Sequence, residues 1–100
     1  KVVAFMEEHL EQSISLRDMA ALVALSPVHF TRQFKRTTGN TPHQHLLILR
    51  IERAKRLLAG ALPIAEIAFR CGFSHQEHLT RVFGRIVGVT PSAYRRSLSH

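Results

Sequence analysis

Two Thr-Arg pairs, each placed between large apolar residues, are the clearest chemical feature of this chain of 100 residues. Residues 30–34 read Phe-Thr-Arg-Gln-Phe, and residues 79–83 read Leu-Thr-Arg-Val-Phe. If each segment is helical, at about 100° per residue, its apolar ends share one side and the Thr-Arg pair faces away from them. An arginine presented in this way can donate two hydrogen bonds to one planar group, such as the O6 and N7 edge of guanine.

The Thr-Arg pairs belong to a longer repeat that covers most of the chain. An apolar-x-x-apolar-Ala stretch begins at Leu16 and again at Ile64, and each is followed by an apolar-Ser pair, a Thr-Arg segment and Gly-x-Thr-Pro. The copies are offset by 48 residues up to the serine and by 49 after it, so the second copy contains one extra residue. Two copies of one supersecondary unit are the simplest explanation. Each predicts a helix, a tight turn and a second helix, with Ala20 or Ala68 where the two helices approach closely.

The turn inside each copy differs in sequence. Gly72 stands where the second turn requires a positive φ, a conformation that glycine adopts without steric cost. Its counterpart in the first copy is Ala24. We therefore expect the first turn to be built differently.

Gly and Pro mark the breaks between segments whose apolar residues have helical spacing. Seven helices are expected, at about 2–10, 16–24, 27–38, 42–59, 63–71, 75–87 and 91–96, and the absence of alternating segments predicts an all-α fold. Ser, Thr and Pro give the start signals of several of them, with Ser15, Ser26, Thr41, Ser74 and Thr90 as the expected caps. The expected buried faces are Leu16, Met19, Ala20 and Val23; Phe30 and Phe34; Leu47, Ile51, Ala54 and Leu58; and Leu79, Val82, Phe83 and Ile86.

The composition favours a basic, folded domain. Fourteen Lys and Arg against seven Asp and Glu give a formal net charge of +7, which indicates an anionic partner, although a basic surface kept for solubility would also explain it. The single cysteine, Cys71, excludes an intramolecular disulfide and fits the reducing cytoplasm. We expect its thiol to be buried and inert. No apolar run approaches the roughly 20 residues that a membrane-spanning helix needs.

The chain resembles the AraC/XylS family of bacterial transcription regulators over nearly its whole length, and its second half matches the family's signature in order and spacing. The resemblance implies the C-terminal DNA-binding domain of such a regulator, with homeodomain-like three-helix subdomains at 1–40 and 60–100 and a long linker helix at 41–59. It also implies that two recognition helices enter adjacent major-groove segments, about 34 Å apart. The matching pattern is Ala54-x-x-Leu57-Leu58, Ile64-x-x-Ile67-Ala68, Gly72-Phe73, Thr80-Arg81-x-Phe83, Gly88-x-Thr90-Pro91 and Tyr94-Arg95.

Candidate DNA-binding residues follow from the resemblance by position. Base contacts are implied for Val28, Thr31 and Arg32 in the first recognition helix, and for Gln76, Glu77, His78 and Arg81 in the second. Their chemistry agrees: arginine suits guanine, Gln76 suits adenine, Glu77 can accept from cytosine N4, and Val28 can contact a thymine methyl group. Lys35, Arg36 and Arg85 lie further along the helices and are expected at phosphates. Gly84 departs from the family pattern, which commonly has a basic residue there.

Other kinds of site have little support in the sequence. His43 with His45, and His75 with His78, are spaced for a metal, but neither pair has an evident third ligand, so we expect no metal and no cofactor. No spacing predicts a catalytic arrangement, so an enzyme ranks last. The alternative that stays open is a helical interaction module whose basic face docks on an acidic protein or a membrane surface.

The expected partner is double-stranded DNA, and RNA polymerase is expected as a second partner. Because the chain begins with Lys1 rather than Met, we expect a fragment of a longer protein. The family commonly places an effector-sensing or dimerisation domain ahead of this one, so dimerisation through a domain absent from this chain is expected.

Overall fold

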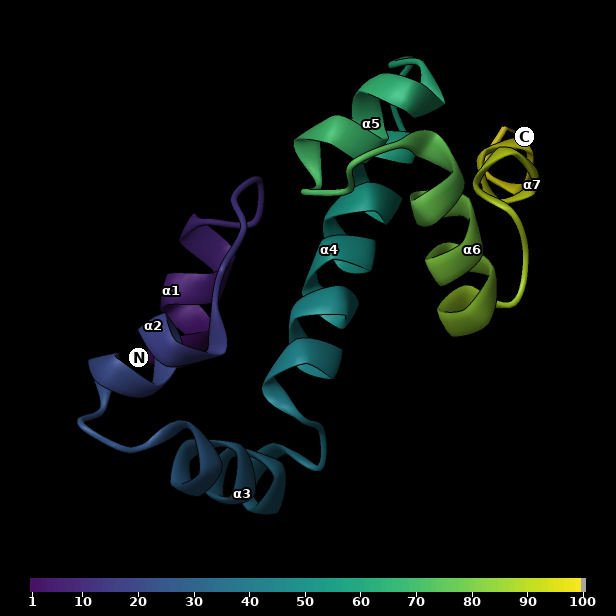
Figure 1. Cartoon of the computed structure of the whole chain (residues 1–100). Coiled ribbons are helices and arrows are strands. Elements are labelled where there is room, and N and C mark those ends of the chain that lie inside the picture. The colour runs from purple at the N-terminus through teal and green to yellow at the C-terminus, as the bar shows by residue number, and fades with distance from the viewer. Residues whose placement is uncertain (100) are drawn as a thin grey trace. The chain divides into compact units, whose positions relative to one another are not determined.

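Seven helices make up the fold in the part of the chain that the structure describes, and the predicted all-α class is confirmed. The computed structural model describes residues 1–99, and this part of the chain contains no strand. The chain divides into two compact units, Lys1–Leu49 and Arg50–His100, called unit 1 and unit 2 here. The helices are α1 Val2–Glu8, α2 Leu16–Leu22, α3 Pro27–Thr38, α4 Pro42–Leu58, α5 Ile64–Arg70, α6 Gln76–Val87 and α7 Pro91–Ser97 (Figure 1).

Most of the predicted start signals act as helix caps. The Oγ atoms of Ser15 and Ser26 accept the backbone N–H groups three residues ahead, at 3.0 and 3.2 Å. Thr90 does the same for α7 at 3.1 Å. Thr41 and Gln44 cap α4 reciprocally: the hydroxyl accepts from the Gln44 N–H, and the Gln44 amide oxygen accepts from the Thr41 N–H. Each such cap supplies a partner to an N–H group that the helix leaves without one.

The prediction that Ser74 caps the sixth helix is wrong. The N-cap of α6 is His75, whose Nδ1 accepts the backbone N–H of His78 at 3.3 Å. The extra residue of the second copy explains the difference. Helix α6 begins 49 residues after α3 begins at Pro27, but Ser74 follows Ser26 by only 48.

The two turns have the same conformation, so the expectation of a different first turn is wrong. Gly72 has a φ of 88° and Ala24 has a φ of 56°, both in the left-handed region. In each turn the next residue returns a hydrogen bond to the alanine of the preceding helix, from Leu25 to Ala20 at 3.1 Å and from Phe73 to Ala68 at 3.0 Å. This shared bonding pattern places an alanine in a conformation that normally favours glycine.

Unit 1 has one apolar core, formed by α1, α2, α3 and the beginning of α4. Leu16 and Val23 were expected inside it, but they are 39% and 36% exposed. Leu16 is the first residue of α2 and Val23 follows its last, so both lie at ends that the neighbouring elements cover incompletely. The buried members of the core are Val2, Met6, Leu10, Met19, Ala20, Phe30, Phe34 and Leu46.

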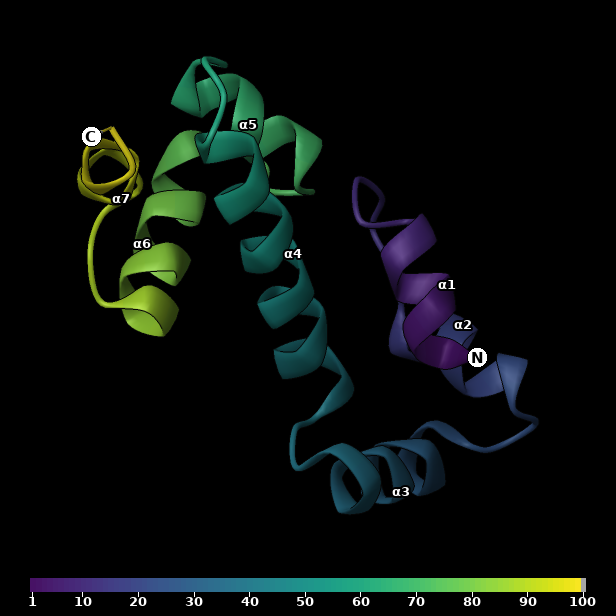
Figure 2. The ribbon, with the colours of Figure 1, turned by 180° about the vertical axis from the view of Figure 1, so that it is seen from behind.

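Helix α4, continuous in Figure 2, begins in unit 1 and ends in unit 2. The prediction of one apolar stripe starting at Leu47 is wrong at that residue. Leu46 is buried in the unit 1 core, whereas Leu47 is only half-buried. One apolar stripe does not describe α4, because its first residues belong to unit 1 and its last residues belong to unit 2.

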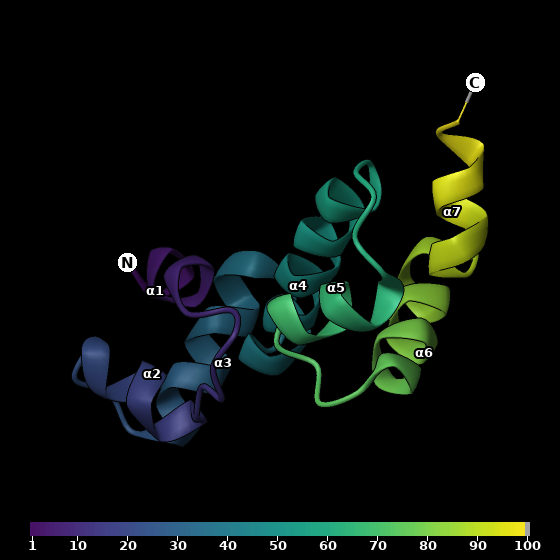
Figure 3. The ribbon, with the colours of Figure 1, turned by 90° about the horizontal axis from the view of Figure 1, so that it is seen from above.

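Unit 2 has a second core around α5 and α6, and α7 packs against α6 (Figure 3). Ile86 was expected inside but is 42% exposed, since it lies in the last turn of α6. Cys71 is buried, as predicted. The other buried apolar residues of this unit include Ile51, Ala54, Leu58, Ile67, Ala68, Phe73, Leu79, Val82 and Phe83.

Candidate nucleic-acid interface

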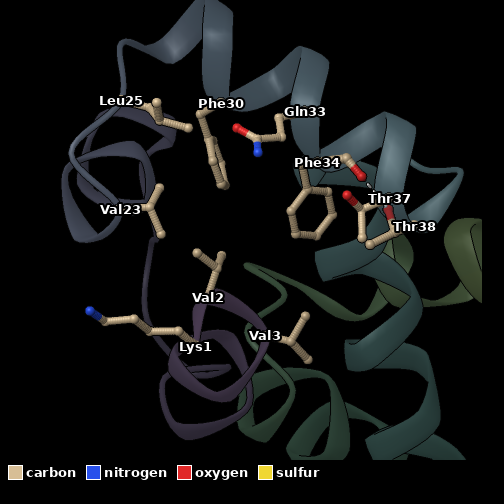
Figure 4. A pocket seen from close by; sticks show the side chains of 10 residues that line it. All are labelled: Lys1, Val2, Val3, Val23, Leu25, Phe30, Gln33, Phe34, Thr37 and Thr38. Atoms are coloured by element: carbon tan, nitrogen blue, oxygen red, sulfur yellow. Dashed lines mark hydrogen bonds between the residues drawn. The ribbon is translucent and has the colours of Figure 1, made fainter.

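Helix α3 is anchored by two phenylalanines and exposes its opposite side. Phe30 and Phe34 are buried, with ring centroids 5.6 Å apart. Figure 4 shows both rings extending from α3 toward Val2 and Val3 of α1, beside a hollow of about 500 Å³. Because the rings hold one side of the helix in the core, the other side is presented to water. The predicted residues on that side are Val28, Arg32, Lys35 and Arg36, all exposed, and Thr31, which is half-buried.

Arg32 separates two surface hollows along α3. On one side an apolar hollow is lined by Leu16, Pro27, Val28, Thr31 and Arg32. On the other side a second hollow is lined by Leu25 and by four side chains with hydrogen-bonding groups, those of His29, Arg32, Gln33 and Arg36. His29 and Gln33 were not among the predicted site residues, although the spacing of 29, 32, 33 and 36 along a helix places them together. Donor groups arranged in such a row are suited to phosphate oxygens.

Helix α6 repeats the arrangement in unit 2. Leu79, Val82 and Phe83 are buried, while Arg81 and Arg85 are exposed. Phe83 also meets Tyr94 of α7 edge-on, at 5.5 Å between ring centroids, which fixes the buried side of α6. The predicted residues Gln76 and Glu77 are exposed as well, in the first turn of the helix.

His78 occupies a more constrained position than the other predicted residues of α6. It is half-buried, and its ring meets the ring of Phe73 edge-on, at 5.1 Å between centroids. Its backbone N–H is already donated to His75. His78 therefore contributes to the packing at the start of α6 in addition to any contact with a ligand.

The exposed sides of α3 and α6 are predominantly cationic. They carry five exposed cations, Arg32, Lys35, Arg36, Arg81 and Arg85, and these helices contain one acidic residue, Glu77. In the part of the chain that the structure describes, none of the five is in an ion pair. Ion pairs that the structure shows elsewhere include Lys55 with Glu52 and Arg70 with Glu66. The five cations are thus available to an anionic partner.

The paired histidines do not gather further ligands in the described residues. Within 1–99 there is no group of three or more His, Cys, Asp or Glu side chains that could hold a metal ion. His45 packs edge-on against Phe34, with 5.4 Å between ring centroids. Among the same residues, no helix is both long enough and apolar enough to span a membrane.

Together these features define a helix-turn-helix protein. A short helix, a tight turn with a left-handed residue and a longer, amphipathic second helix form a helix-turn-helix, and this chain contains two. A family model described as a helix-turn-helix domain matches residues 19–97. The chain belongs to the AraC-type helix-turn-helix family, so the resemblance seen in the sequence is confirmed.

Known proteins of this family share both the sequence and the fold. The MmsAB operon regulatory protein of Pseudomonas aeruginosa is 38% identical over 94 residues, which cover 93% of this chain and 31% of that protein. The DNA-binding domain of AdpA, a global transcriptional factor solved in complex with a target DNA, is 37% identical, with a TM-score of 0.90 over 96% of this chain and 87% of that one. An AraC-type regulator from Chromobacterium violaceum is 31% identical, with a TM-score of 0.91 over 99% and 89%. The chain spans about a third of the length of the curated relatives it matches.

Proposed function

We propose that this chain binds double-stranded DNA with sequence preference, as the DNA-binding domain of a bacterial transcription regulator. Helices α3 and α6 are its recognition helices, and each enters the major groove with the residues of its first turns at the base edges. The observation that carries the proposal is the duplicated surface, in which Arg32 and Arg81 stand exposed at equivalent positions of two helices anchored by buried apolar residues. A recognition helix requires this arrangement.

The exposed residues divide into base readers and phosphate binders. Arg32 and Arg81 donate to guanine, Gln76 recognises adenine and Glu77 accepts from cytosine N4. Thr31 and His78 are both half-buried. They contact bases from the edge of the exposed side of α3 and of α6. Lys35, Arg36 and Arg85, one or two turns further along, bind phosphates and so contribute affinity rather than sequence choice. His29 and Gln33 join Arg36 at the phosphates next to α3.

Two recognition helices in one chain imply a bipartite DNA site. The proposed half-sites are neighbouring major-groove segments, about one helical turn or 34 Å apart. Helix α4 has 17 residues, so it is about 26 Å long.

The proposal extends to control of transcription initiation in the bacterial cytoplasm. A regulator bound beside a promoter acts through RNA polymerase, and the remaining part of a longer regulator supplies dimerisation or effector sensing. Both are expectations from the family, and the chain's relatives are about three times its length. A reporter carrying the preferred site upstream of a promoter tests this step, with an Arg81→Ala variant as control.

Binding to DNA is tested by gel shift against duplexes of selected and random sequence at several salt concentrations. We expect affinity to fall with salt, because phosphate contacts release counterions, while a preference for the selected duplex persists at each concentration. Equal weak binding to every polyanion would contradict the proposal. That result would favour a basic interaction module for an acidic protein or membrane surface.

A further inference from the structure

The apolar hollow at the start of α3 is an unusual surface for a cationic interface. Its volume is about 380 Å³, and its walls are Leu16 of α2 with Pro27, Val28, Thr31 and Arg32 of α3. We call it the Val28 hollow. Val28 is 64% exposed and Leu16 is 39% exposed, although unit 1 has a core nearby. Apolar side chains left in water beside an exposed arginine suggest a partner with an apolar group of its own.

We propose that the Val28 hollow binds the 5-methyl group of thymine, so that unit 1 selects thymine at a base pair adjoining the one contacted by Arg32. The inference rests on the proposed function and adds Leu16 and Pro27 to its specificity-determining residues. Among the four bases, thymine alone carries a methyl group on its major-groove edge. The methyl group would replace water against Leu16 and Val28.

The spacing of the residues supports two neighbouring contacts. Val28 and Arg32 are separated by four positions on α3, which places their Cβ atoms about 5–6 Å apart. Successive bases of one strand are separated by about 3.4 Å along the helix axis. Because Arg32 also lines the Val28 hollow, its guanidinium and the apolar walls approach the same short stretch of DNA. A guanine contact by Arg32 and a methyl contact by Val28 are therefore compatible.

Unit 2 lacks this selectivity at the equivalent place. The counterpart of Val28 is Glu77, 49 residues further along, which is also exposed in the first turn of its helix. A carboxylate accepts hydrogen bonds and offers a methyl group no favourable contact, so it suits the amino group of cytosine instead. The two halves of the DNA site should then differ at this position.

Replacement of thymine by deoxyuridine tests the inference, because it removes one methyl group and keeps every hydrogen-bonding group. A preferred duplex is first selected from random sequences, and Arg32→Ala identifies the half-site that unit 1 reads. Each thymine is then replaced singly. We expect one replacement in that half-site to weaken binding about threefold to fivefold, the value for one buried methyl group. Replacements in the half-site of unit 2 should not depend on Val28.

Variants of the hollow assign the methyl contact to its walls. Val28→Ala and Leu16→Ala should each reduce the difference in binding between the thymine and the deoxyuridine duplexes. Alanine favours helices more than valine, so Val28→Ala should leave α3 folded, which circular dichroism can verify. The matched control is Val23→Ala, which truncates an exposed valine of unit 1 outside the hollow and should retain the full difference.

The outcomes separate the inference from the function on which it rests. If a preferred duplex is found but no replacement in the unit 1 half-site weakens binding, the inference is wrong and DNA recognition stands. The inference also fails if the replacement effect persists unchanged in Val28→Ala. If no preferred duplex can be selected at all, the proposed function itself is wrong.

Discussion

Arg32 and Arg81 share a position in the repeat, but they lie in different chemical surroundings. Arg32 lies between the apolar Val28 hollow and a second hollow that His29, Gln33 and Arg36 also line. Arg81 follows Glu77 by one helical turn, on a helix whose first turn is polar. At the scale of single residues, we therefore expect the two arginines to make similar hydrogen bonds to guanine. The base pairs next to each guanine should differ, because the residues around the two arginines differ.

Arg81→Ala tests the assignment of base readers. We expect the free energy of binding to the preferred duplex to weaken by about 1–3 kcal/mol, with loss of preference at one base pair, because a bidentate contact to guanine is removed. Site selection with the variant and gel shift against single-base variants of the duplex measure both effects. Arg85→Ala is the control, and it should weaken all duplexes alike. An Arg81→Ala variant with unchanged site preference would mean that another surface reads the DNA.

Ala24 tests the cost of a left-handed alanine. With a φ of 56°, it occupies the conformation that Gly72 occupies in unit 2. We expect Ala24→Gly to raise the free energy of unfolding by roughly 0.5–1 kcal/mol and Gly72→Ala to lower it by a similar amount. Chemical denaturation of both variants provides the measurement.

Ala21→Gly is the control for Ala24→Gly, because Ala21 is an exposed residue of α2 next to the turn. Glycine inside a helix costs about 1 kcal/mol relative to alanine, so this variant should lose stability. If both substitutions destabilise the protein equally, the strain assigned to Ala24 is absent.

At the scale of elements, Arg95 connects α7 to the end of α4. Its Nε donates to the carbonyl oxygen of Leu58 at 3.1 Å, and its Nη2 donates to that of Leu62 at 2.7 Å. The last carbonyl groups of a helix have no partner within the helix, and a cation there also interacts favourably with the helix dipole. Arg95 therefore joins α7 to the end of α4 and to the segment that follows it.

Substitution of Arg95 should therefore destabilise unit 2. We expect Arg95→Met to lower the free energy of unfolding by about 1–3 kcal/mol, since it removes two charge-assisted hydrogen bonds while keeping an apolar stem. Thermal or chemical denaturation measures the change. The adjacent Arg96 is exposed, and Arg96→Met should have almost no effect. Equal effects of the two substitutions would contradict the role assigned to Arg95.

Gly84 is a position at which a substitution can stabilise α6. It has helical geometry, and an added Cβ would meet no atom within 4 Å. We expect Gly84→Lys to stabilise the helix by about 1 kcal/mol and to steepen the dependence of binding on salt by about one unit, as one more phosphate contact would. Denaturation and salt titrations of binding are the two measurements.

Gly84→Ala separates the two effects of Gly84→Lys, because it should increase stability without changing the salt slope. Lys35 is the counterpart of Gly84 in α3. Lys35→Ala should therefore flatten the slope by about one unit and weaken all sequences alike. A slope that is the same for Gly84→Ala and Gly84→Lys would show that this position does not face a phosphate.

At the scale of the whole molecule, the proposed bipartite DNA site can be tested by changing the spacing of its two half-sites. An insertion of five base pairs between them rotates one half-site by about half a turn of DNA. We expect specific affinity to fall at least tenfold, because one recognition helix then loses its base contacts. A further insertion to ten base pairs should not restore it, since the half-sites are then no longer adjacent major-groove segments, as the proposed function requires. Full recovery at ten base pairs would indicate that the units bind independently.

The local part of this structure could be predicted from the sequence because its causes are local. A Ser, Thr or Pro at a helix start, a glycine at its end and apolar residues at helical spacing act within a few positions of each other. These signals placed all seven helices, and the repeat located the exposed sides of α3 and α6. Family membership followed from the same ordered motifs.

Tertiary structure decided which apolar residues stay in water and how the turn at Ala24 is formed. Leu16, Val23 and Ile86 have the spacing of core residues, but burial depends on segments distant in the sequence that do not cover the ends of their helices. Packing of α2 against α3 places Ala24 in the conformation that Gly72 adopts, against its own preference. The spacing of residues along one helix shows which of them share a side of that helix, but it does not show what packs against that side. The Val28 hollow could therefore be identified only from the tertiary structure.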